Sequence, residues 1–425
     1  MLFKRFFKNC QGGVAPMLAL SLIPMVGMVG AAVDYSRANS ARTAFQSAVD
    51  SAALMLSKNA ATQSAGDLQT SATNFVKAMF TRPEVSNIAV TATYTSNNGS
   101  TVLLNGTAVV NTNFLGMLGY TKIDLKANST VTWGNTRLRV ALVLDNTGSM
   151  SSSSKMTALK TATQNLLTQL KKAAVTDGDV YVSIIPFSKD VNVGASNYDQ
   201  SWIRWDLWEA ENGKCSNNNY STQSSCLNHN KTWTPDNHNT WNGCVTDRDQ
   251  NFDTTNTAPV SGANLYPAEQ YSSCPTPVMG LSYDWTALSS KVDAMQPNGN
   301  TNQGIGLQMG WQTLTASPFT IPAKDSNYTY QDVIILLTDG LNTENRWYTN
   351  QSSIDNRQQK TCDNIKAAGI TLYTVQVNTG NDSTSTLLKN CASSTSKFFL
   401  LTSANQIVTT FNQIGTALSN LRVTN

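Results

Sequence analysis

The sequence predicts an α/β protein in which a doubly wound, mainly parallel sheet with flanking helices follows a smaller N-terminal part. Two observations favour this fold. From residue 136 onward, apolar runs of strand length alternate with helical patterns, which is typical of parallel strands joined by crossover helices. Several of these runs are apolar at every position, as expected for strands that are covered on both faces. Ahead of them lie an uncharged segment at residues 14–33 and a mixed helix and strand pattern at residues 34–135.

The composition limits the classes of function. The chain has 425 residues, which is enough for two or three domains with separate cores. Charged residues make up 13% of it, about half the usual share. The net charge is +3, and no basic run occurs after the first eight residues, so the concentrated basic face that nucleic acid requires is missing. The two histidines also restrict chemistry that depends on imidazole.

The N-terminal segment predicts a membrane anchor. Three basic residues lie within the first eight, and the segment that runs from residue 14 to residue 33 carries no charge. Twenty helical residues rise about 30 Å, which matches the hydrocarbon core of a bilayer. We therefore expect this segment to be a transmembrane helix, with residues 1–13 in the cytoplasm and the rest of the chain outside. The alternative is a cleaved signal peptide with Gly30 and Ala32 before the cut, although the apolar stretch is longer than the core of such signals.

Residues 34–135 are expected to form a small module of helices and strands, which would act as a stalk. Apolar residues at helical spacing continue the anchor helix outward, and a second helix is predicted around residues 68–80. Three segments then alternate or run apolar in the manner of strands, at residues 87–95, 101–110 and 122–133. This module offers no candidate for chemistry.

The main domain is predicted to span residues 136–425, with one large insertion at about residues 194–283. The predicted strands are 138–145, 180–187, 331–340, 369–377 and 396–401, and the predicted helices are 155–172, 286–295, 302–315, 352–368, 383–391 and 405–421.

The cysteines favour an exported, disulfide-bonded domain. Beyond the anchor the chain has an even number of them: Cys215, Cys226, Cys244 and Cys274 in the insertion, then Cys362 and Cys391. We expect the last two to pair, whereas the four in the insertion allow three pairings that the sequence leaves open. The alternative is a zinc site, because Cys226, His229, His238 and Cys244 follow a spacing that loosely resembles a zinc finger.

The insertion is also rich in tryptophan. Trp202, Trp205 and Trp208 recur at three-residue spacing in a segment with few aliphatic residues. The favoured interpretation is that they fill a small core stapled by disulfides. The alternative is an exposed aromatic strip that stacks on carbohydrate or on a partner.

Oxygen-bearing side chains gather where predicted strands end. Asp145 ends one buried strand and Asp339 follows another, and ligands of doubly wound folds bind outside the carboxyl ends of the strands. Thr147 and Ser149 lie at alternate positions in the loop that follows Asp145, so both hydroxyls can face the same point as its carboxylate. Thr301 lies in a loop just before a predicted helix. These residues form an all-oxygen set, which suits a hard divalent cation such as Mg²⁺ or Mn²⁺ and argues against zinc or copper.

The order of these residues resembles the metal-ion-dependent adhesion site, MIDAS, of von Willebrand factor A (VWA) domains. The pattern D-x-T-x-S at residues 145–149 is followed by Thr301 and by Asp339 in T-D-G, with Thr147 in place of the commoner serine. The resemblance covers about residues 136–425 and implies a VWA-type fold. It also implies a bound divalent cation, Mg²⁺ first and Mn²⁺ or Ca²⁺ as alternatives, which accepts an acidic residue from a protein partner.

A second resemblance concerns the N-terminal segment. "GGVAPMLALSLIPMVGMVGAAVDYSRA" and "FQSAVDSAAL" look like TadG-like proteins of the Flp/Tad pilus-assembly systems, and "WNGCVTDRDQ", "GNTNQGIGLQMGWQTL" and "LLTDGLNTENRW" are similar to the adhesion-type domain of that group. This family implies a bacterial membrane protein with a single N-terminal anchor and a periplasmic or extracellular domain, acting with pilus or envelope components in pilus assembly or surface adhesion. Prepilin-type cleavage after Gly13 would leave Leu18 at the fifth position instead of glutamate, so an uncleaved anchor is favoured.

Two other functions remain as alternatives to metal-bridged binding. A phosphatase-like, metal-dependent hydrolase is disfavoured, because a D-x-D pattern would need aspartate at position 147, where threonine stands. The sequence therefore predicts a protein that is not an enzyme and has no catalytic residues. The remaining alternative is a structural envelope scaffold in which the cation only stiffens the loops.

Overall fold

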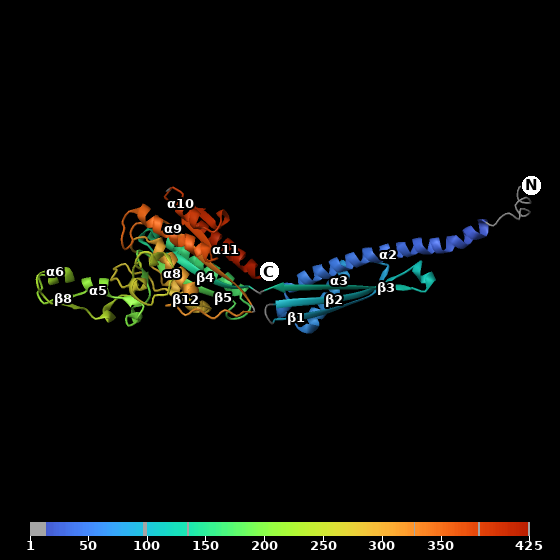
Figure 1. The fold of residues 1–425 in the computed structure, drawn as a ribbon, viewed down its shortest axis with the longest axis horizontal. Helices are drawn as coiled ribbons and strands as arrows, with labels where there is room; N and C mark the ends of the chain where they lie inside the picture. The colour runs from blue at the N-terminus through green and yellow to red at the C-terminus, as the bar shows by residue number, and fades with distance from the viewer. Residues whose placement is uncertain (1–13, 97–99, 134–135, 327, 381–382, 424–425) are drawn as a thin grey trace, which may run out of the picture. The chain divides into compact units, whose positions relative to one another are not determined.

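The computed structural model describes residues 14–96, 100–133, 136–326, 328–380 and 383–423, and the chain divides into two compact units between residues 135 and 136 (Figure 1). The segment predicted to be cytoplasmic, residues 1–13, lies outside the described residues.

The N-terminal unit packs two helices on an antiparallel sheet. Its helices are α2 (Val14–Ser57) and α3 (Ala65–Met79), and its strands β1 (Val85–Thr95), β2 (Ser100–Asn111) and β3 (Lys122–Trp133) lie in the order β1-β2-β3. The side chains of β2 alternate between buried and exposed, as they do in a sheet that is covered on one face. Gly106 lets α2 approach this sheet closely, because a Cβ at that position would lie 2.7 Å from the Phe45 ring. The predicted stalk module is therefore a small α+β unit.

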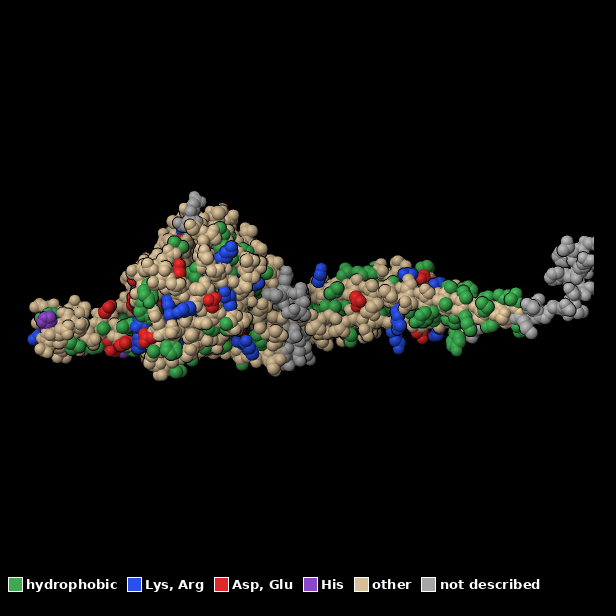
Figure 2. Space-filling model, turned by 45° about the horizontal axis from the view of Figure 1, so that its top comes forward, with side chains coloured by type: hydrophobic (Ala, Val, Ile, Leu, Met, Phe, Trp, Pro, Cys, Tyr) green, Lys and Arg blue, Asp and Glu red, His purple; other side chains and the backbone are tan. Residues whose placement is uncertain are grey.

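Helix α2 begins in the segment that the sequence predicts to be transmembrane. Within the described part of the chain, none of the helices combines the length and the apolar character needed to cross a bilayer. Hydrophobic side chains are nevertheless exposed along the N-terminal part of α2 (Figure 2). The transmembrane helix at residues 14–33 stays a prediction.

The C-terminal unit is built on a mixed sheet with the strand order β10-β6-β5-β4-β13-β14-β15. The strands β5, β4, β13, β14 and β15 run parallel to one another, as the sequence predicts. At one side of the sheet, β6, β10 and β12 add antiparallel pairs. The parallel strands are β4 (Thr136–Asp145), β5 (Val180–Phe187), β13 (Thr329–Thr338), β14 (Thr371–Val377) and β15 (Phe398–Leu401), and the antiparallel ones are β6 (Val191–Asn192), β10 (Cys244–Val245) and β12 (Met279–Ser282).

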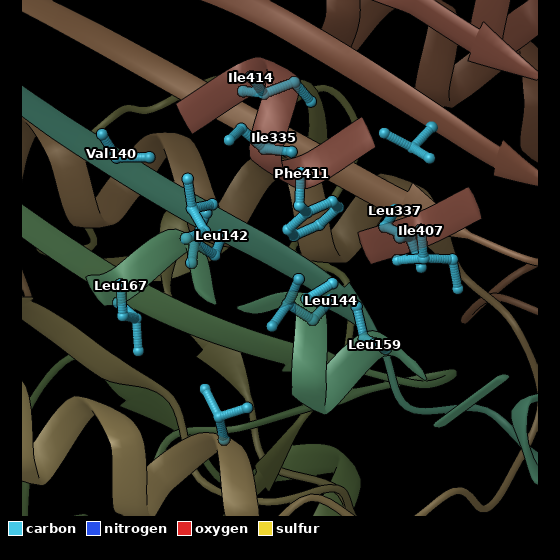
Figure 3. Packing of buried hydrophobic residues seen from close by; sticks show 14 of the residues in the cluster. Val140, Leu142, Leu144, Leu159, Leu167, Ile335, Leu337, Ile407, Phe411 and Ile414 are labelled. Atoms are coloured by element: carbon cyan, nitrogen blue, oxygen red, sulfur yellow. The ribbon is translucent and has the colours of Figure 1, made fainter. Parts of the chain in front are cut away.

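Helices cover both faces of this sheet. The helices are α4 (Lys155–Ala173), α7 (Trp285–Asp293), α8 (Gln303–Thr315), α9 (Gln351–Ala367), α10 (Thr386–Cys391) and α11 (Asn405–Val423). Alternate residues of β4 enter different cores. Leu142 and its even-numbered neighbours pack against α4, α7 and α11, as Figure 3 shows for α4 and α11. Val143 packs against α8 on the opposite face, in a second core to which α9 and α10 also contribute. The unit therefore has the doubly wound arrangement that the sequence predicts.

The insertion is a loop-rich segment stapled by disulfides. Its short elements are β7 (Ile203–Arg204), α5 (Asp206–Glu211), β8 (Gly213–Cys215), α6 (Gln223–Asn228), β9 (Trp233–Pro235) and β11 (Tyr266–Pro267). Cys215 bonds to Cys226 and Cys244 bonds to Cys274, which settles the pairing that the sequence left open. The predicted bond between Cys362 and Cys391 is also present, and it joins α9 to α10.

The zinc alternative is wrong, because Cys226 and Cys244 are both held in disulfides. Its two histidines are stacked on aromatic rings instead. The His229 ring lies 4.2 Å from the Tyr220 ring between centroids, and the His238 ring lies 3.7 Å from the Trp205 ring.

Two tryptophans of the insertion are buried in a small core. Trp208 and Trp241 are each 2% exposed, and Trp205 contacts both of them edge to face. Their indole N–H groups are satisfied inside the fold: Trp208 donates to Gln270 Oε1 at 2.8 Å, and Trp241 donates to the Cys244 carbonyl at 2.7 Å. The favoured interpretation from the sequence therefore fits Trp208 and Trp241, while Trp202 and Trp205 are half-buried and carbohydrate binding by them stays a prediction.

Candidate metal site

Two neighbouring parallel strands bring Asp145 and Asp339 to one edge of the sheet. Strand β4 ends at Asp145, and β13 ends at Thr338, one residue before Asp339. The two strands are paired in register up to Leu144 and Leu337, so the residues that follow leave the sheet side by side. The predicted carboxylates therefore share the carboxyl end of the sheet, where doubly wound folds bind ligands.

Two hydroxyl groups stand between these carboxylates, in a line of short oxygen–oxygen distances. Asp145 Oδ1 accepts from the Thr147 backbone N–H at 2.8 Å and from Thr147 Oγ1 at 2.6 Å. Thr147 Oγ1 lies 3.0 Å from Ser149 Oγ, and Ser149 Oγ donates to Asp339 Oδ1 at 2.6 Å. Four of the five predicted ligands are thus assembled through one network.

Thr301, the fifth predicted ligand, is held beside them through its loop. The Gly148 N–H donates to the Gly299 carbonyl at 3.0 Å, which joins this loop to the loop that follows β4. Thr301 itself exchanges hydrogen bonds with Thr343: its N–H donates to Thr343 Oγ1 at 2.8 Å, and its carbonyl accepts from the Thr343 N–H at 2.9 Å. Among the described residues, the Thr301 hydroxyl forms no hydrogen bond with the other four ligands.

The site is buried at its base and open at one residue. Asp145, Thr147, Thr301 and Asp339 are all buried, whereas Ser149 is exposed. Burial, followed by the nearby charge of Asp339, raises the pKa of Asp145 to about 6. Two carboxylates that approach each other in a buried place resist ionising together, and a cation between them would remove that penalty.

Two residues of the site have no role in the sequence-based prediction. Thr338 Oγ1 donates to Asp145 Oδ2 at 2.6 Å, so both oxygens of that carboxylate are engaged. Lys155 is buried, and its ammonium group donates to Asp339 Oδ2. Lys155 is the first residue of α4, where the helix dipole disfavours a positive charge. A lysine at the start of a predicted helix therefore indicates that a nearby carboxylate compensates its charge.

A polar network fixes the loops behind the site. The Gln303 N–H donates to Asn342 Oδ1 at 2.9 Å, and Gln303 Nε2 donates to the Gly340 carbonyl at 3.1 Å. Asn342 Nδ2 donates a hydrogen bond to Gln358 Oε1 at 2.6 Å, and Gln358 Nε2 donates one to Gln303 Oε1 at 2.9 Å. The network joins the start of α8, the loop after β13 and α9, so the loops that carry Thr301 and Asp339 are braced against one another.

The chemistry of these donors fits a hard divalent cation. The five residues supply carboxylate and hydroxyl oxygens, which Mg²⁺, Mn²⁺ and Ca²⁺ prefer. Among the described residues, no group of three or more His, Cys, Asp and Glu side chains is placed to hold a metal ion. The candidate site instead combines two carboxylates with three hydroxyls.

Comparison with known families identifies two parts of the chain. Residues 12–61 match the family described as Flp pilus-assembly TadE/G-like, and residues 268–413 match the von Willebrand factor type A domain. Both resemblances that the sequence suggests are confirmed. The second match includes Thr301 and Asp339, while residues 145–149 lie ahead of it. A comparison with curated proteins found no match.

Solved structures of similar chains include adhesion proteins. The pilus adhesin SpaC from Lactobacillus rhamnosus GG is similar at 14% identity and a TM-score of 0.40, over 80% of this chain and 35% of SpaC. The vWF domain of the type V pili tip protein Mfa5 from Porphyromonas gingivalis gives 12% identity and a TM-score of 0.38, over 68% of this chain and 97% of that domain. Proximal thread matrix protein 1 from the mussel byssus, with a zinc-occupied MIDAS motif, is similar at 14% identity and a TM-score of 0.34. The similarity covers 67% of this chain and 46% of that protein. This chain thus spans about a third of SpaC, and similarity at this level does not assign a function.

Mg²⁺ binding should weaken as the pH falls through the pKa of Asp145. That pKa lies above the ordinary value of 3.8, at about 6, so the folded chain takes up a proton there and loses a charged ligand. The same shift makes the metal-free fold less stable as the pH rises from about 4 to above 6, because the buried carboxyl must then ionise. We expect the dissociation constant for Mg²⁺ to be steady above pH 7 and to rise up to about tenfold per pH unit below pH 6.

Titration calorimetry between pH 5 and pH 8 measures this dependence. Asp145→Asn is the control and should bind no Mg²⁺ at any pH. A wild-type dissociation constant that stays the same from pH 5 to pH 8 would contradict the prediction.

Lys155→Met should tighten Mg²⁺ binding. The Lys155 ammonium group competes with Mg²⁺ for Asp339 Oδ2 and repels Mg²⁺ at short range. Its removal should therefore increase the affinity for Mg²⁺ by about tenfold or more. Lys155→Arg keeps the charge and should leave the affinity within a few-fold of wild type. The measurement is Mg²⁺ calorimetry together with the Mg²⁺-induced rise in melting temperature, and a weaker affinity in Lys155→Met would show that the lysine supports the ion.

Proposed function

We propose that this chain, which carries a TadE/G-like segment and a VWA domain, binds an envelope or pilus partner through a divalent cation. The ligands would be Asp145, Thr147, Ser149, Thr301 and Asp339. The observation that carries the proposal is the pair of buried carboxylates bridged by two hydroxyls at adjacent strand ends. Mg²⁺ is the favoured ion, with Mn²⁺ or Ca²⁺ as alternatives, because each accepts oxygen ligands of this kind. The partner would assist pilus assembly, surface adhesion or both.

The residues of the site divide the work of holding such an ion. When bound, the cation supplies a Lewis-acidic position for a carboxylate oxygen from the partner. Thr147 and Ser149 contribute neutral oxygens, which leave more positive charge uncompensated than carboxylates would. The hydroxyl of Thr338 fixes Asp145, while the Lys155 ammonium group competes with the ion for Asp339. Exposure of Ser149 leaves one side of the site open to a partner.

A catalytic role and a purely structural role are the competing functions. Thr147 stands where the D-x-D pattern of a phosphatase needs a second aspartate, and its hydroxyl is engaged by Asp145. A structural cation would stiffen the loops without needing an open side, whereas Ser149 is exposed. Both alternatives therefore explain the site less well than binding of a partner carboxylate.

Removing the Thr147 hydroxyl should weaken metal-dependent carboxylate binding strongly. Thr147→Val keeps the shape of the side chain but loses a ligand, and Thr147→Ser is the matched control that keeps the hydroxyl. The probe is a blocked tripeptide with a central aspartate, whose NMR lines should broaden when wild type or Thr147→Ser holds Mn²⁺. We expect at least tenfold weaker binding for Thr147→Val, and no binding for the asparagine tripeptide or in EDTA.

Equal binding of the asparagine peptide, or binding that persists in EDTA, would overturn metal-bridged recognition. Mn²⁺ binding without any peptide binding would support the structural role. Hydrolysis of p-nitrophenyl phosphate that requires Asp145 would support the phosphatase alternative. In a strain lacking this chain, surface attachment should return with Thr147→Ser and not with Thr147→Val.

The segment at residues 14–33 is the proposed membrane anchor. Its support is the exposed apolar surface of α2, where Leu20 is 71% exposed and Met28 is 72% exposed. Large apolar side chains that are exposed together on one helix favour a lipid environment. The anchor would keep the VWA domain at the bacterial envelope, on the periplasmic or outer side.

Charged substitutions in this segment should release the chain from membranes. Two lysines, introduced as Leu20→Lys and Met28→Lys, each cost about 3 kcal/mol at the centre of a spanning helix. We expect the double variant to move from the membrane fraction to the soluble fraction after carbonate extraction. The control is Thr43→Lys, at an exposed position further along α2, which should stay with the membrane. Membrane retention of the double variant would argue against this anchor.

A further inference from the structure

A loop of the N-terminal unit lies against the end of the segment that we propose as the membrane anchor. This loop joins β2 to β3, spans residues 112–121 and contains the short 3-10 helix η2 (Leu115–Leu118). It carries no charged side chain. Figure 1 shows it beside the N-terminal half of α2. We call it the β2–β3 loop.

The Asp34 carboxylate fastens the β2–β3 loop to α2. Asp34 directly follows the proposed anchor at residues 14–33, and it is 2% exposed. Its Oδ2 accepts from the Phe114 N–H and from the Leu115 N–H, each at 2.8 Å. The Asn113 N–H lies 3.1 Å from both carboxylate oxygens. Hydrogen bonds to an ionised carboxylate are stronger than neutral ones, so the position of the loop along α2 is fixed.

Gly30 lets the loop approach the anchor segment itself. A Cβ at Gly30 would lie 2.5 Å from the Phe114 Cβ, so a larger residue there would displace Phe114. Gly30 belongs to the last turn of residues 14–33. A side chain that packs on that turn shares its depth, which is the edge of the hydrocarbon core when the anchor spans a bilayer.

The loop exposes large apolar side chains at this depth. Met117 is 82% exposed, Tyr120 is 69% exposed and Phe114 is 41% exposed. Tyr35, which follows Asp34 on α2, is exposed as well. Apolar side chains that gather on a surface mark a contact with a partner or a membrane. Tyrosine is typical of the boundary between lipid tails and headgroups, because its ring is apolar and its hydroxyl is polar.

The backbone of the loop is suited to a place with little water. The Thr112 N–H donates to the Thr121 carbonyl at 3.1 Å, and the Tyr120 N–H donates to the Leu115 carbonyl at 3.0 Å. The Thr112 hydroxyl donates to the Tyr120 carbonyl. Asp34 holds three more N–H groups of the same loop. Unpaired backbone groups are costly near hydrocarbon, and these bonds reduce that cost.

We propose that the β2–β3 loop is a second membrane contact, in which Phe114, Met117 and Tyr120 enter the interface of the bilayer that holds α2. This inference rests on the proposed anchor and adds a lipid-binding surface outside it. Lipid is favoured over a protein partner, because the contacts with Gly30 and Asp34 fix the loop where the anchor leaves the hydrocarbon. A single helix can tilt and rotate in a bilayer, whereas a second contact restricts both motions of the N-terminal unit.

The test places a nitroxide label on the full chain in vesicles of phosphatidylethanolamine and phosphatidylglycerol. Cys10→Ser removes the cysteine outside the three disulfides, and Met117→Cys then carries the label. Thr130→Cys, at an exposed position near the other end of β3, is the control. Spin relaxation gives the ratio of collisions with oxygen, which enters lipid, to collisions with a water-soluble nickel chelate. We expect this ratio to be at least about fivefold higher at position 117 than at position 130.

Asp34→Ala tests the fastening of the loop. It removes the acceptor of three backbone N–H groups and leaves residues 14–33 unchanged. The ratio at position 117 should fall toward that at position 130, while carbonate extraction still finds the chain in the membrane fraction. Asp50→Ala removes another carboxylate of α2, which accepts from Gln46, and should leave the ratio unchanged. A ratio that is also unchanged in Asp34→Ala would overturn the role of Asp34 in setting the depth of the loop.

Equal ratios at positions 117 and 130, with the chain in the membrane fraction, would overturn the loop contact and leave the anchor standing. A chain that does not enter vesicles would overturn both. Shielding of position 117 that disappears when the lipid-to-protein ratio is raised about tenfold would assign the surface to a second copy of the chain, and lipid contact would be wrong. Each measurement is made in EDTA, so metal-bridged binding is tested separately.

Discussion

The approach of Asp145 to Asp339 is the constraint on which the C-terminal unit depends. Two buried carboxylates at adjacent strand ends repel one another unless hydroxyls, an ammonium group or a cation stand between them. The structure supplies Thr147, Ser149 and Thr338 as hydroxyls and Lys155 as the ammonium group. The adjacency of β4 and β13 and the position of the start of α4 are therefore coupled through charge as well as through apolar packing.

Much of this architecture is predictable from the sequence, because its signals are local. The apolar strands and the helices of the doubly wound sheet follow from periodicity within short windows, and α4, for example, begins at the predicted residue 155. The antiparallel strands β6, β10 and β12 are different: they contain two to four residues, which is too few for a period to appear. The pairing of the four cysteines in the insertion also depends on contacts that no local pattern encodes.

The candidate site shows the same division between local and distant signals. Asp145, Thr147 and Ser149 lie within one short motif, so their common loop is evident from spacing alone. The roles of Lys155 and Thr338 depend on hydrogen bonds to residues 184 and 193 positions away. The network of Gln303, Asn342 and Gln358 is likewise invisible without the fold, because glutamine and asparagine carry no distinctive pattern.

Asp247 and Asn302 show how the insertion is fastened to the sheet. Asn302, which caps α8 beside Thr301, donates to Asp247 Oδ2 at 2.8 Å. All five candidate ligands lie outside residues 194–283. Substitutions in the insertion can therefore change its shape and charge and leave every candidate metal ligand in place. The residues that would hold a cation are thus separate in the sequence from the insertion, so the insertion can vary without rebuilding the candidate metal site.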